Sequence, residues 1–299
     1  MVDRPTVFRM ADLKRYPEAS RIHFVECSGN GGGAYNPERM RTEMSPQSLD
    51  GLLSNSEWTG VMLSTILQEV GVQPGASWVL AEGRDAAMLS RSIPLAKAMD
   101  DAMLAYGQNG EAIRPEQGYP LRLALPGWEG NAQVKWLRRL EVSDRPTMTR
   151  EETSKYTDLL PGGKAAQFTL EMGVKSVITR PSVGMAMQGP GLYEISGIAW
   201  SGSGRITRVD ISADGGKTWA PSALQEPTLS KSLTRFRIPL QWKGAEPVHL
   251  QSRATDDNGN TQPTRDEWQS GYGPGAYYHY NAIQAWKVEP DGRVRNTYE

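Results

Sequence analysis

The second half of the chain alternates short apolar runs with turn signals, and this pattern restricts the possible folds more than any other feature. The runs cover residues 192–195, 206–211, 236–240 and 248–250, with an Asp-Gly-Gly segment at 214–216 and an Asp-Asn-Gly-Asn segment at 257–260. Short strands separated by such turns are typical of two packed antiparallel sheets. The pattern therefore predicts an immunoglobulin-like β-sandwich.

The first half shows a mixed pattern of helices and strands. Apolar positions from Val61 to Val70 repeat at helical spacing, and Gly71 supplies a stop. Residues 22–25, 78–80 and 121–125 are short apolar runs that indicate strands. This half is therefore expected to fold as a mixed α/β domain.

A polar stretch between the two patterns marks the expected domain boundary. Residues 143–163 alternate charges and contain two prolines and two glycines, as linkers often do. A chain of 299 residues is long enough for two domains with separate cores. We therefore predict an α+β protein with a mixed α/β domain over residues 1–160 and a sandwich domain over residues 161–299.

The charge balance excludes some classes of partner. The chain has 33 basic and 34 acidic residues, whereas binding to nucleic acid or anionic membranes needs a basic excess. No apolar run reaches the roughly 18 residues of a membrane span. The opening MVDRPTVFRM lacks the basic and apolar regions of a signal peptide. We therefore expect no nucleic-acid partner, no membrane span and no signal peptide in this chain.

Cys27 is the only cysteine, so an internal disulfide or a cysteine-rich metal site is excluded. A lone cysteine after a strand is most often a small buried apolar residue. However, four of the six residues after Cys27 are glycine, which lets the backbone approach a bulky ligand and leaves amide groups available. Thiolate is also a soft metal ligand. The loop alone leaves both interpretations open.

Three glycine-containing segments have simpler explanations than ligand binding. Residues 29–33 are not followed by the Gly-Lys-Ser/Thr of a phosphate-binding loop, and residues 216–218 lack its first glycine. The second segment is better explained as a hairpin turn. Residues 256–260 lack the ligand spacing and closing glutamate of a calcium loop, and a turn is again expected.

Several spaced motifs occur together in the first half. They are Glu26-Cys27-Ser28-Gly29-Asn30, Glu82-Gly83-Arg84-Asp85, Ser92-Ile93-Pro94-Leu95, and Gly118 to Arg122 continuing to Val134-Lys135-Trp136-Leu137. In content, order and spacing they resemble the sulfite oxidase family of molybdenum enzymes. The resemblance implies a molybdopterin-binding domain followed by an immunoglobulin-like dimerisation domain. It also implies a molybdenum cofactor (Mo-molybdopterin) and a homodimer.

The resemblance assigns roles to individual residues. Cys27 matches the cysteine that ligates molybdenum, and Tyr156 matches the tyrosine near the metal, so these two are the expected catalytic residues. Gln117 stands where many members have a histidine, so that contact is expected as an amide hydrogen bond. The full set expected to bind the cofactor is Cys27, Asp85, Gln117, Arg122, Gln133 and Lys135.

Two positions depart from the pattern of sulfite oxidases, which hold the sulfite dianion with arginines. This chain has Gly31 and Gly32 after Asn30, and residues 268–271 read Trp-Gln-Ser-Gly at the later site. With Lys155-Tyr156 and the Gly-Tyr-rich segment 271–280, the pattern looks like the SoxC type of molybdenum subunit in sulfane dehydrogenases. That type implies a substrate sulfur on a carrier protein, a c-type cytochrome subunit as electron acceptor, and work in the periplasm.

Members of the family have a further segment, with an Arg-Asn-His motif, ahead of the position of Met1. Its absence here leads us to expect either an incomplete chain or weaker cofactor binding. The alternative to an enzyme is therefore a catalytically silent, truncated relative that acts as a dimerising scaffold.

Overall fold

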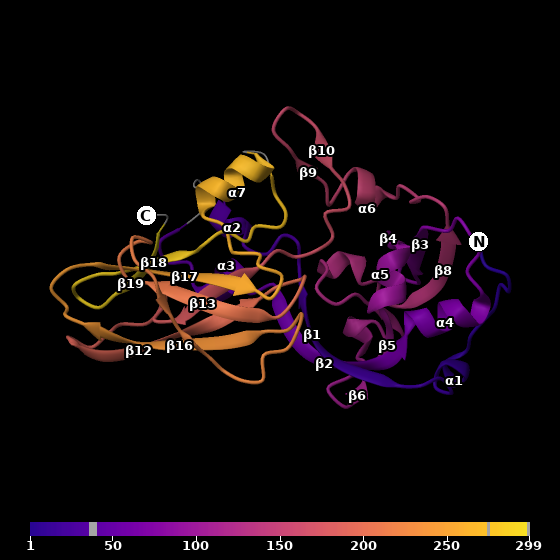
Figure 1. Ribbon diagram of the computed structural model, residues 1–299, viewed down its shortest axis with the longest axis horizontal. Coiled ribbons are helices and arrows are strands. Elements are labelled where there is room, and N and C mark those ends of the chain that lie inside the picture. Colours follow the sequence, from indigo (N-terminus) through magenta and orange to yellow (C-terminus); the bar gives the residue numbers. More distant parts are fainter. Residues whose placement is uncertain (36–40, 274–275, 298–299) are drawn as a thin grey trace. The chain divides into compact units, whose positions relative to one another are not determined.

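The computed structural model describes residues 1–35, 41–273 and 276–297, and its contacts divide the chain into two compact units (Figure 1). Unit 1 comprises Met1–Val25, Asn55–Thr157 and Gln167–Leu170, and unit 2 comprises Glu26–Ser54, Asp158–Ala166 and Glu171–Glu299. Each unit is described separately below.

Unit 1 contains short helices and two small sheets. The helices are α1 (Met10–Leu13), α4 (Leu63–Val70), α5 (Leu95–Asp100) and α6 (Arg150–Thr153), with 3-10 turns η1 (Pro115–Gln117) and η2 (Gly130–Ala132). The strands are β1 (Ala19–Glu26), β2 (Leu53–Met62), β3 (Trp78–Gly83), β4 (Ser90–Pro94), β5 (Met103–Gln108), β6 (Glu111–Ala112), β7 (Arg122–Ala124) and β8 (Leu137–Ser143). One sheet has the order β1-β2-β5-β6 with β7 on β5, and the other has the order β4-β3-β8.

The core of unit 1 explains why α4 forms where it does. Leu63, Ile66, Leu67 and Val70 are buried on one face of α4, at the spacing that brings side chains to the same side of a helix. Gly71 follows with a φ of +72°, a conformation that glycine adopts without strain. The predicted helix is confirmed from Leu63 onward, but its first two predicted residues, 61 and 62, instead end β2.

Unit 2 is built mainly from strands. Its strands are β9 (Asp158–Leu159), β10 (Ala165–Ala166), β11 (Lys175–Arg180), β12 (Gly191–Trp200), β13 (Ile206–Ser212), β14 (Ala220–Pro221), β15 (Ala223–Leu224), β16 (Thr234–Trp242), β17 (Val248–Asp256), β18 (Ala285–Val288) and β19 (Val294–Thr297). Its helices are α2 (Gly32–Tyr35), α3 (Pro46–Asp50) and α7 (Arg265–Tyr272).

Two sheets of unit 2 face each other as the layers of a sandwich (Figure 1). Their strand orders are β11-β12-β16-β15 and β14-β13-β17-β18-β19, and the pairings recorded within each sheet are antiparallel. The indole of Trp286 on β18 donates to the carbonyl of Ile178 on β11 at 3.0 Å. Buried tryptophans at positions 200, 242 and 286 fill the interior.

The predicted fold class is confirmed: a mixed α+β unit and a β-sandwich. Both turns proposed in the sandwich are present, because residues 214–219 connect β13 to the antiparallel β14 and residues 257–260 form the turn after β17. The domain boundary remains a prediction, and residues 26–54 group with unit 2. Among the described residues, no helix is both long and apolar enough to cross a membrane.

Candidate functional site

Cys27 begins a loop directly after β1, and its side chain is exposed. The loop backbone is fixed on both sides of the thiol, because the amide of Cys27 donates to Leu52 O at 3.0 Å and the amide of Gly31 donates to Leu49 O at 2.8 Å. An exposed thiol on an anchored loop is not a buried apolar residue. Its sulfur is accessible at the surface.

The segment 271–280 reaches this loop, as far as the structure describes it. The amide of His279 donates to Ser28 O at 2.8 Å. Residues 274 and 275 lie outside the described residues. The preceding residues 268–271 belong to α7, where Trp268 is buried.

A buried carboxylate supports the cysteine loop from behind. Glu26 is 1% exposed and accepts hydrogen bonds from Asn30 Nδ2 at 2.9 Å and from Trp200 Nε1 at 2.7 Å. Burial raises the pKa of the Glu26 carboxyl, because a charge is costly to remove from water. The same asparagine accepts from the amide of Leu52 at 3.0 Å, so Glu26 fixes the loop through Asn30.

Lys175 on β11 joins this cluster. Its Nζ lies 2.6 Å from Asp50 Oδ1 and 3.8 Å from Glu26 Oε1, and all three side chains are buried. Two carboxylates therefore share one ammonium behind the cysteine loop. We call Glu26, Asp50 and Lys175 the acid–lysine cluster.

Arg122 on β7 is the most unusual cation in unit 1. It is 3% exposed, and its NH1 donates to Gln117 O at 3.2 Å and to Gln117 Oε1 at 3.1 Å. Its Cζ lies 4.7 Å from the centroid of the Trp58 ring. Within the described residues it has no carboxylate partner, and its Nε and Trp58 Nε1 have no hydrogen-bond partner. Burial lowers the pKa of Arg122 to about 10.

Lys135, Asp85 and Gln133 lie in neighbouring loops of the same unit. Lys135 Nζ donates to Glu116 O at 2.9 Å. Gln133 Nε2 donates to the carbonyl of Trp128 at 3.0 Å. Asp85 Oδ1 accepts from the amide of Leu89 at 3.2 Å. Each of these side chains is held by backbone groups.

Two glycines allow these loops to approach closely. A Cβ at Gly118 would lie 2.8 Å from Lys135 Cβ, and a Cβ at Gly83 would lie 2.7 Å from Lys135 O and 3.2 Å from Asp85 Oδ2. Such distances leave no room for a side chain. Packing therefore favours glycine at both positions, and at Gly118 the φ of +106° favours it as well.

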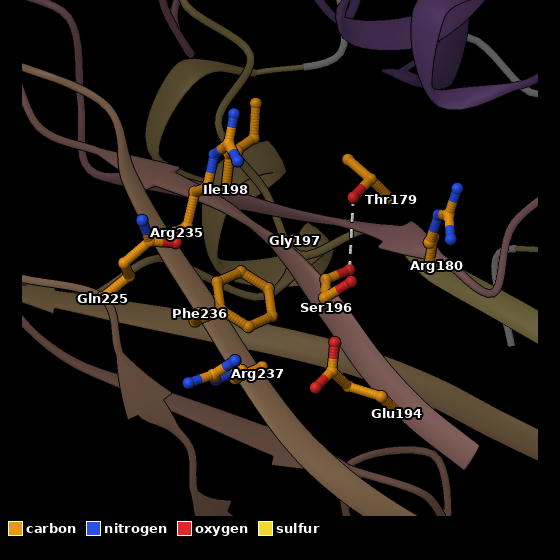
Figure 2. Close-up of a pocket in the computed structure, with 10 residues that line it drawn as sticks. All are labelled: Thr179, Arg180, Glu194, Ser196, Gly197, Ile198, Gln225, Arg235, Phe236 and Arg237. Atoms are coloured by element: carbon orange, nitrogen blue, oxygen red, sulfur yellow. Dashed lines mark hydrogen bonds between the residues drawn. The ribbon is translucent and has the colours of Figure 1, made fainter.

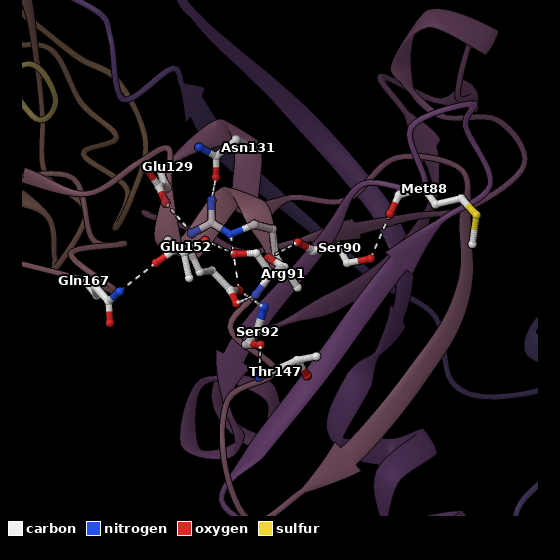
Figure 3. Close-up of polar contacts among 11 residues, drawn as sticks. Met88, Ser90, Arg91, Ser92, Glu129, Asn131, Thr147, Glu152 and Gln167 are labelled. Carbon is white, nitrogen blue, oxygen red and sulfur yellow. Dashed lines mark hydrogen bonds and ion pairs between the residues drawn. The ribbon is translucent and has the colours of Figure 1, made fainter.

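Tyr156 lies in unit 1 beside Arg91, which belongs to a second buried network; Figure 3 shows that network. Arg91 on β4 is 1% exposed, and its NH2 lies 2.8 Å from Glu129 Oε1. Its Nε lies 3.6 Å from Glu152 Oε1, and its NH1 donates to Asn131 Oδ1. The guanidinium also lies over the Tyr156 ring. Buried charges thus fix the segment around α6.

The residues expected from the sequence fall into three groups. Gln117 of η1 and Arg122 of β7 contact each other, and Asp85, Gln133 and Lys135 lie in neighbouring loops of unit 1. Tyr156 is in unit 1 next to Arg91, and Cys27 is in unit 2. Their roles in binding and catalysis remain predictions.

A separate pocket of about 350 Å³ lies on the β11-β12-β16-β15 sheet (Figure 2). Arg180, Arg235, Arg237 and Glu194 are among its lining residues, with Phe236 in the centre of the view. Its lining contains none of the residues expected to bind the cofactor. The pocket is therefore not the candidate cofactor site.

Sequence reasoning missed the buried residues that support the expected ones: Asp50, Trp58, Arg91, Glu129, Glu152, Lys175 and Trp200. Their partners are distant along the chain, as with Trp200 and Glu26, which are 174 positions apart. Glu26 was within a recognised motif, but its role as a buried acceptor was not expected. A charged residue inside an apolar strand pattern, as at Lys175 in β11, is the one available signal.

Comparison with known families defines the class of protein. Residues 1–151 match the oxidoreductase molybdopterin binding domain, and residues 166–285 match the Mo-co oxidoreductase dimerisation domain. The fold and these matches define a molybdopterin-binding oxidoreductase. The chain belongs to the sulfite oxidase family of molybdenum enzymes, as its motifs predicted.

Individual relatives agree with this family. The mitochondrial sulfite oxidase of Rattus norvegicus is 30% identical over 84% of this chain and 50% of its own length. A nitrate reductase [NADH] of Ulva prolifera is 28% identical over 98% of this chain and 38% of its own length. The chain spans about half the length of the sulfite oxidases that it matches. The crystal structure of the sulfane dehydrogenase SoxCD from Paracoccus pantotrophus has a TM-score of 0.93 and 48% identity, over 99% of this chain and 75% of that chain.

The residues present fit the molybdenum cofactor that the family binds. Arg122 is a buried cation with an unpartnered Nε–H and no carboxylate within the described chain. A guanidinium in this state is suited to a phosphate or another oxyanion, which it can bind through several parallel hydrogen bonds. Cys27 supplies an exposed thiol of the type that metals bind as thiolate. Each feature taken separately has the chemistry that one part of a phosphorylated, thiolate-ligated metal cofactor requires.

Proposed function

We propose that this protein is a molybdenum-dependent dehydrogenase that oxidises sulfur carried on another protein, as a sulfane dehydrogenase does. The observation that carries the proposal is the exposed thiol of Cys27 on a loop where Gly31 and Gly32 follow Asn30. These glycines supply no guanidinium that could hold a free dianion. The 48% identity to sulfane dehydrogenase SoxCD over 99% of this chain supports the same choice.

In this proposal each residue has a limited task. Cys27 holds the metal, Arg122 and Lys135 bind the anionic part of the cofactor, and Tyr156 orients the substrate through its phenol. Asp85, Gln117 and Gln133 add hydrogen bonds to the pterin. When bound, the cofactor supplies the redox chemistry, with water as the source of oxygen. The protein positions the substrate and admits water.

The electron balance requires an acceptor. Each oxygen atom that sulfur gains from water releases two protons and two electrons, so adding three oxygens to a terminal sulfane sulfur releases six of each. We propose a c-type cytochrome subunit as acceptor, a sulfur-carrier protein as substrate, and a homodimer formed through residues 166–285, which match a dimerisation domain. We place the reaction in the periplasm, which fractionation of the source cells tests.

Metal analysis tests the proposal. The protein, produced in a host that makes molybdopterin, is expected to carry about one molybdenum per chain and to be active, whereas Cys27→Ser, which lacks the thiolate ligand, is expected to lose its activity. Met148→Ser, which removes an exposed sulfur in unit 1, serves as the control and is expected to keep both. A folded wild-type dimer without molybdenum would contradict the proposal and support an empty scaffold.

A second experiment separates carrier-bound sulfur from free sulfite. In the loaded enzyme, Gly32→Arg adds a guanidinium in the loop after Cys27 and is expected to lower the KM for sulfite. An unchanged KM would argue against the role given to these glycines. Wild-type protein that prefers free sulfite to a carrier-bound persulfide would exclude the sulfane assignment.

A further inference from the structure

We propose that the acid–lysine cluster cancels positive charge behind the Cys27 loop and thereby excludes small dianions such as free sulfite. The choice of substrate rests on the function proposed above, whereas the charge of the cluster does not. The argument uses only residues of unit 2.

Position 31 is closed to side chains by the cluster itself. Gly31 has a φ of +83°, and a Cβ there would lie 2.9 Å from Lys175 Nζ and 3.0 Å from Tyr280 Cδ1. The ammonium of Lys175 therefore occupies the room that a side chain at position 31 would need. No cationic residue can be placed at position 31 without moving Lys175.

The ammonium of Lys175 is not available to bind a substrate, because it is buried and paired with carboxylates. Lys175 is 3% exposed and lies 2.6 Å from Asp50 Oδ1 and 3.8 Å from Glu26 Oε1. If Glu26 is ionised, the cluster has a net charge of −1, and if Glu26 holds a proton, the charge is zero. In neither state is the cluster cationic.

In this proposal, the net charge of the acid–lysine cluster changes the electrostatic potential at the Cys27 thiol. Glu26 directly precedes Cys27, and buried charges interact through a medium that screens them less than water does. A neutral or negative cluster therefore disfavours the approach of a dianion. A sulfur atom on a carrier protein meets less repulsion, because it brings at most one negative charge to the loop.

The cluster is also costly to maintain. Two carboxylates with one ammonium leave a buried acid without a full counter-charge, and buried ion pairs of this kind are often less stable than apolar replacements. Asn30 and Trp200 each donate one hydrogen bond to the Glu26 carboxylate and hold it in place. Because the cluster does not favour stability, its position next to the candidate metal ligand is better explained by a role in substrate specificity.

The test measures the field at Cys27 in protein made without cofactor. Because Cys27 is the only cysteine, methanethiosulfonate reagents modify one site, and comparing variants cancels the difference in intrinsic reactivity between two reagents. The rate with the anionic sulfonatoethyl reagent is divided by the rate with the cationic trimethylammonioethyl reagent at low salt. One unit of added positive charge is expected to raise this ratio roughly tenfold.

Three variants change the charge in known directions. Asp50→Asn is expected to raise the ratio, Asp50→Asn with Glu26→Gln to raise it further or equally, and Lys175→Met to lower it. Asp291→Asn, which removes an exposed carboxylate from the same unit, is the control and is expected to change it less than twofold. The native fold is verified by circular dichroism before labelling.

An unchanged ratio in folded Asp50→Asn, or a raised ratio in Lys175→Met, would overturn the inference. If the double variant does not fold, the two single variants still decide, since they must move the ratio in opposite directions. In molybdenum-loaded enzyme, Asp50→Asn is also expected to lower the KM for sulfite. Loaded wild type that oxidises neither substrate would defeat the proposed function, while the labelling ratio would still decide the charge.

Discussion

The guanidinium of Arg91 lies over the ring of Tyr156, with Cζ 5.5 Å from the ring centroid. Arg91 is itself held between Glu129 and Glu152, which pairs a fully buried cation with two buried carboxylates (Figure 3). Glu152 also accepts from the backbone amides of Ser92 and Thr149, so the network joins β4 to the start of α6. The tyrosine proposed for catalysis therefore lies against a rigid charged support.

Replacing this arginine should destabilise the protein strongly. Arg91→Met leaves Glu129 and Glu152 buried without their cation, and we expect a loss of about 3–5 kcal/mol in the free energy of unfolding. Urea denaturation measures the loss. The control is Arg145→Met: the Arg145 side chain is 84% exposed and pairs with its neighbour Asp144, so a change within about 0.5 kcal/mol is expected. Equal effects of the two substitutions would show that the network is not structural.

Arg122 should behave in the opposite way, because its charge has no carboxylate partner in the described chain. Arg122→Met removes an uncompensated buried charge, so the cofactor-free protein should keep or gain stability. Retention of molybdopterin should fall by about 10- to 100-fold, as the loss of charged hydrogen bonds implies.

Cofactor per chain after dialysis, together with denaturation of the cofactor-free protein, measures both effects. Arg21→Met provides the comparison, since Arg21 is exposed in unit 1 and its NH1 donates to Ser20 O. A large stability loss in Arg122→Met with full cofactor retention would assign Arg122 a purely structural task.

Substitutions at Gly118 and Gly110 can distinguish the cost of backbone strain from the cost of a packing clash. Both have positive φ, +106° and +79°, but a Cβ at Gly118 would lie 2.8 Å from Lys135 Cβ, whereas a Cβ at Gly110 meets nothing within 4 Å. Gly110→Ala is expected to cost about 1–2 kcal/mol from strain alone. Gly118→Ala should cost about 1–3 kcal/mol more, because Lys135 must move. Thermal unfolding of the two variants gives the difference, and equal costs would refute the packing argument.

The turn after β13 should be sensitive to acid. Asp214 accepts hydrogen bonds from Thr218 and Ser212, and those from Thr218 are the main cause that lowers the pKa of Asp214 to about 2. Because the folded-state pKa lies below the ordinary value of 3.8, the carboxylate stabilises the fold above about pH 4. This stabilisation is lost as the pH falls toward 2.

We therefore expect the difference in Tm between wild type and Asp214→Ala to be constant from pH 5 to 7 and to shrink below about pH 4. The matched control is Asp266→Ala, an exposed aspartate in the same unit. A difference that stays constant down to pH 2 would show that the Asp214 carboxylate contributes nothing as an anion.

The sequence by itself determined the fold class and the family. Alternating runs and turns predicted the sandwich because strand periodicity and turn chemistry are local properties of the chain. The helix ending at Gly71 was predicted for the same reason, although its first two residues lie at the end of β2, where strand pairing outweighs helical spacing. The motifs around Cys27, Asp85 and Lys135 predicted the family that the domain matches show.

Only the tertiary structure decided how the charged residues are partnered. The sequence does not show that Lys175 lies between Asp50 and Glu26, that Trp58 lies under Arg122, or that Arg91 lies over Tyr156. These contacts join residues that are distant in sequence, and burial gives the charges their energetic weight. Local patterns specify which elements form, whereas packing in three dimensions decides which charges are neutralised and which, like Arg122, have no carboxylate partner among the described residues.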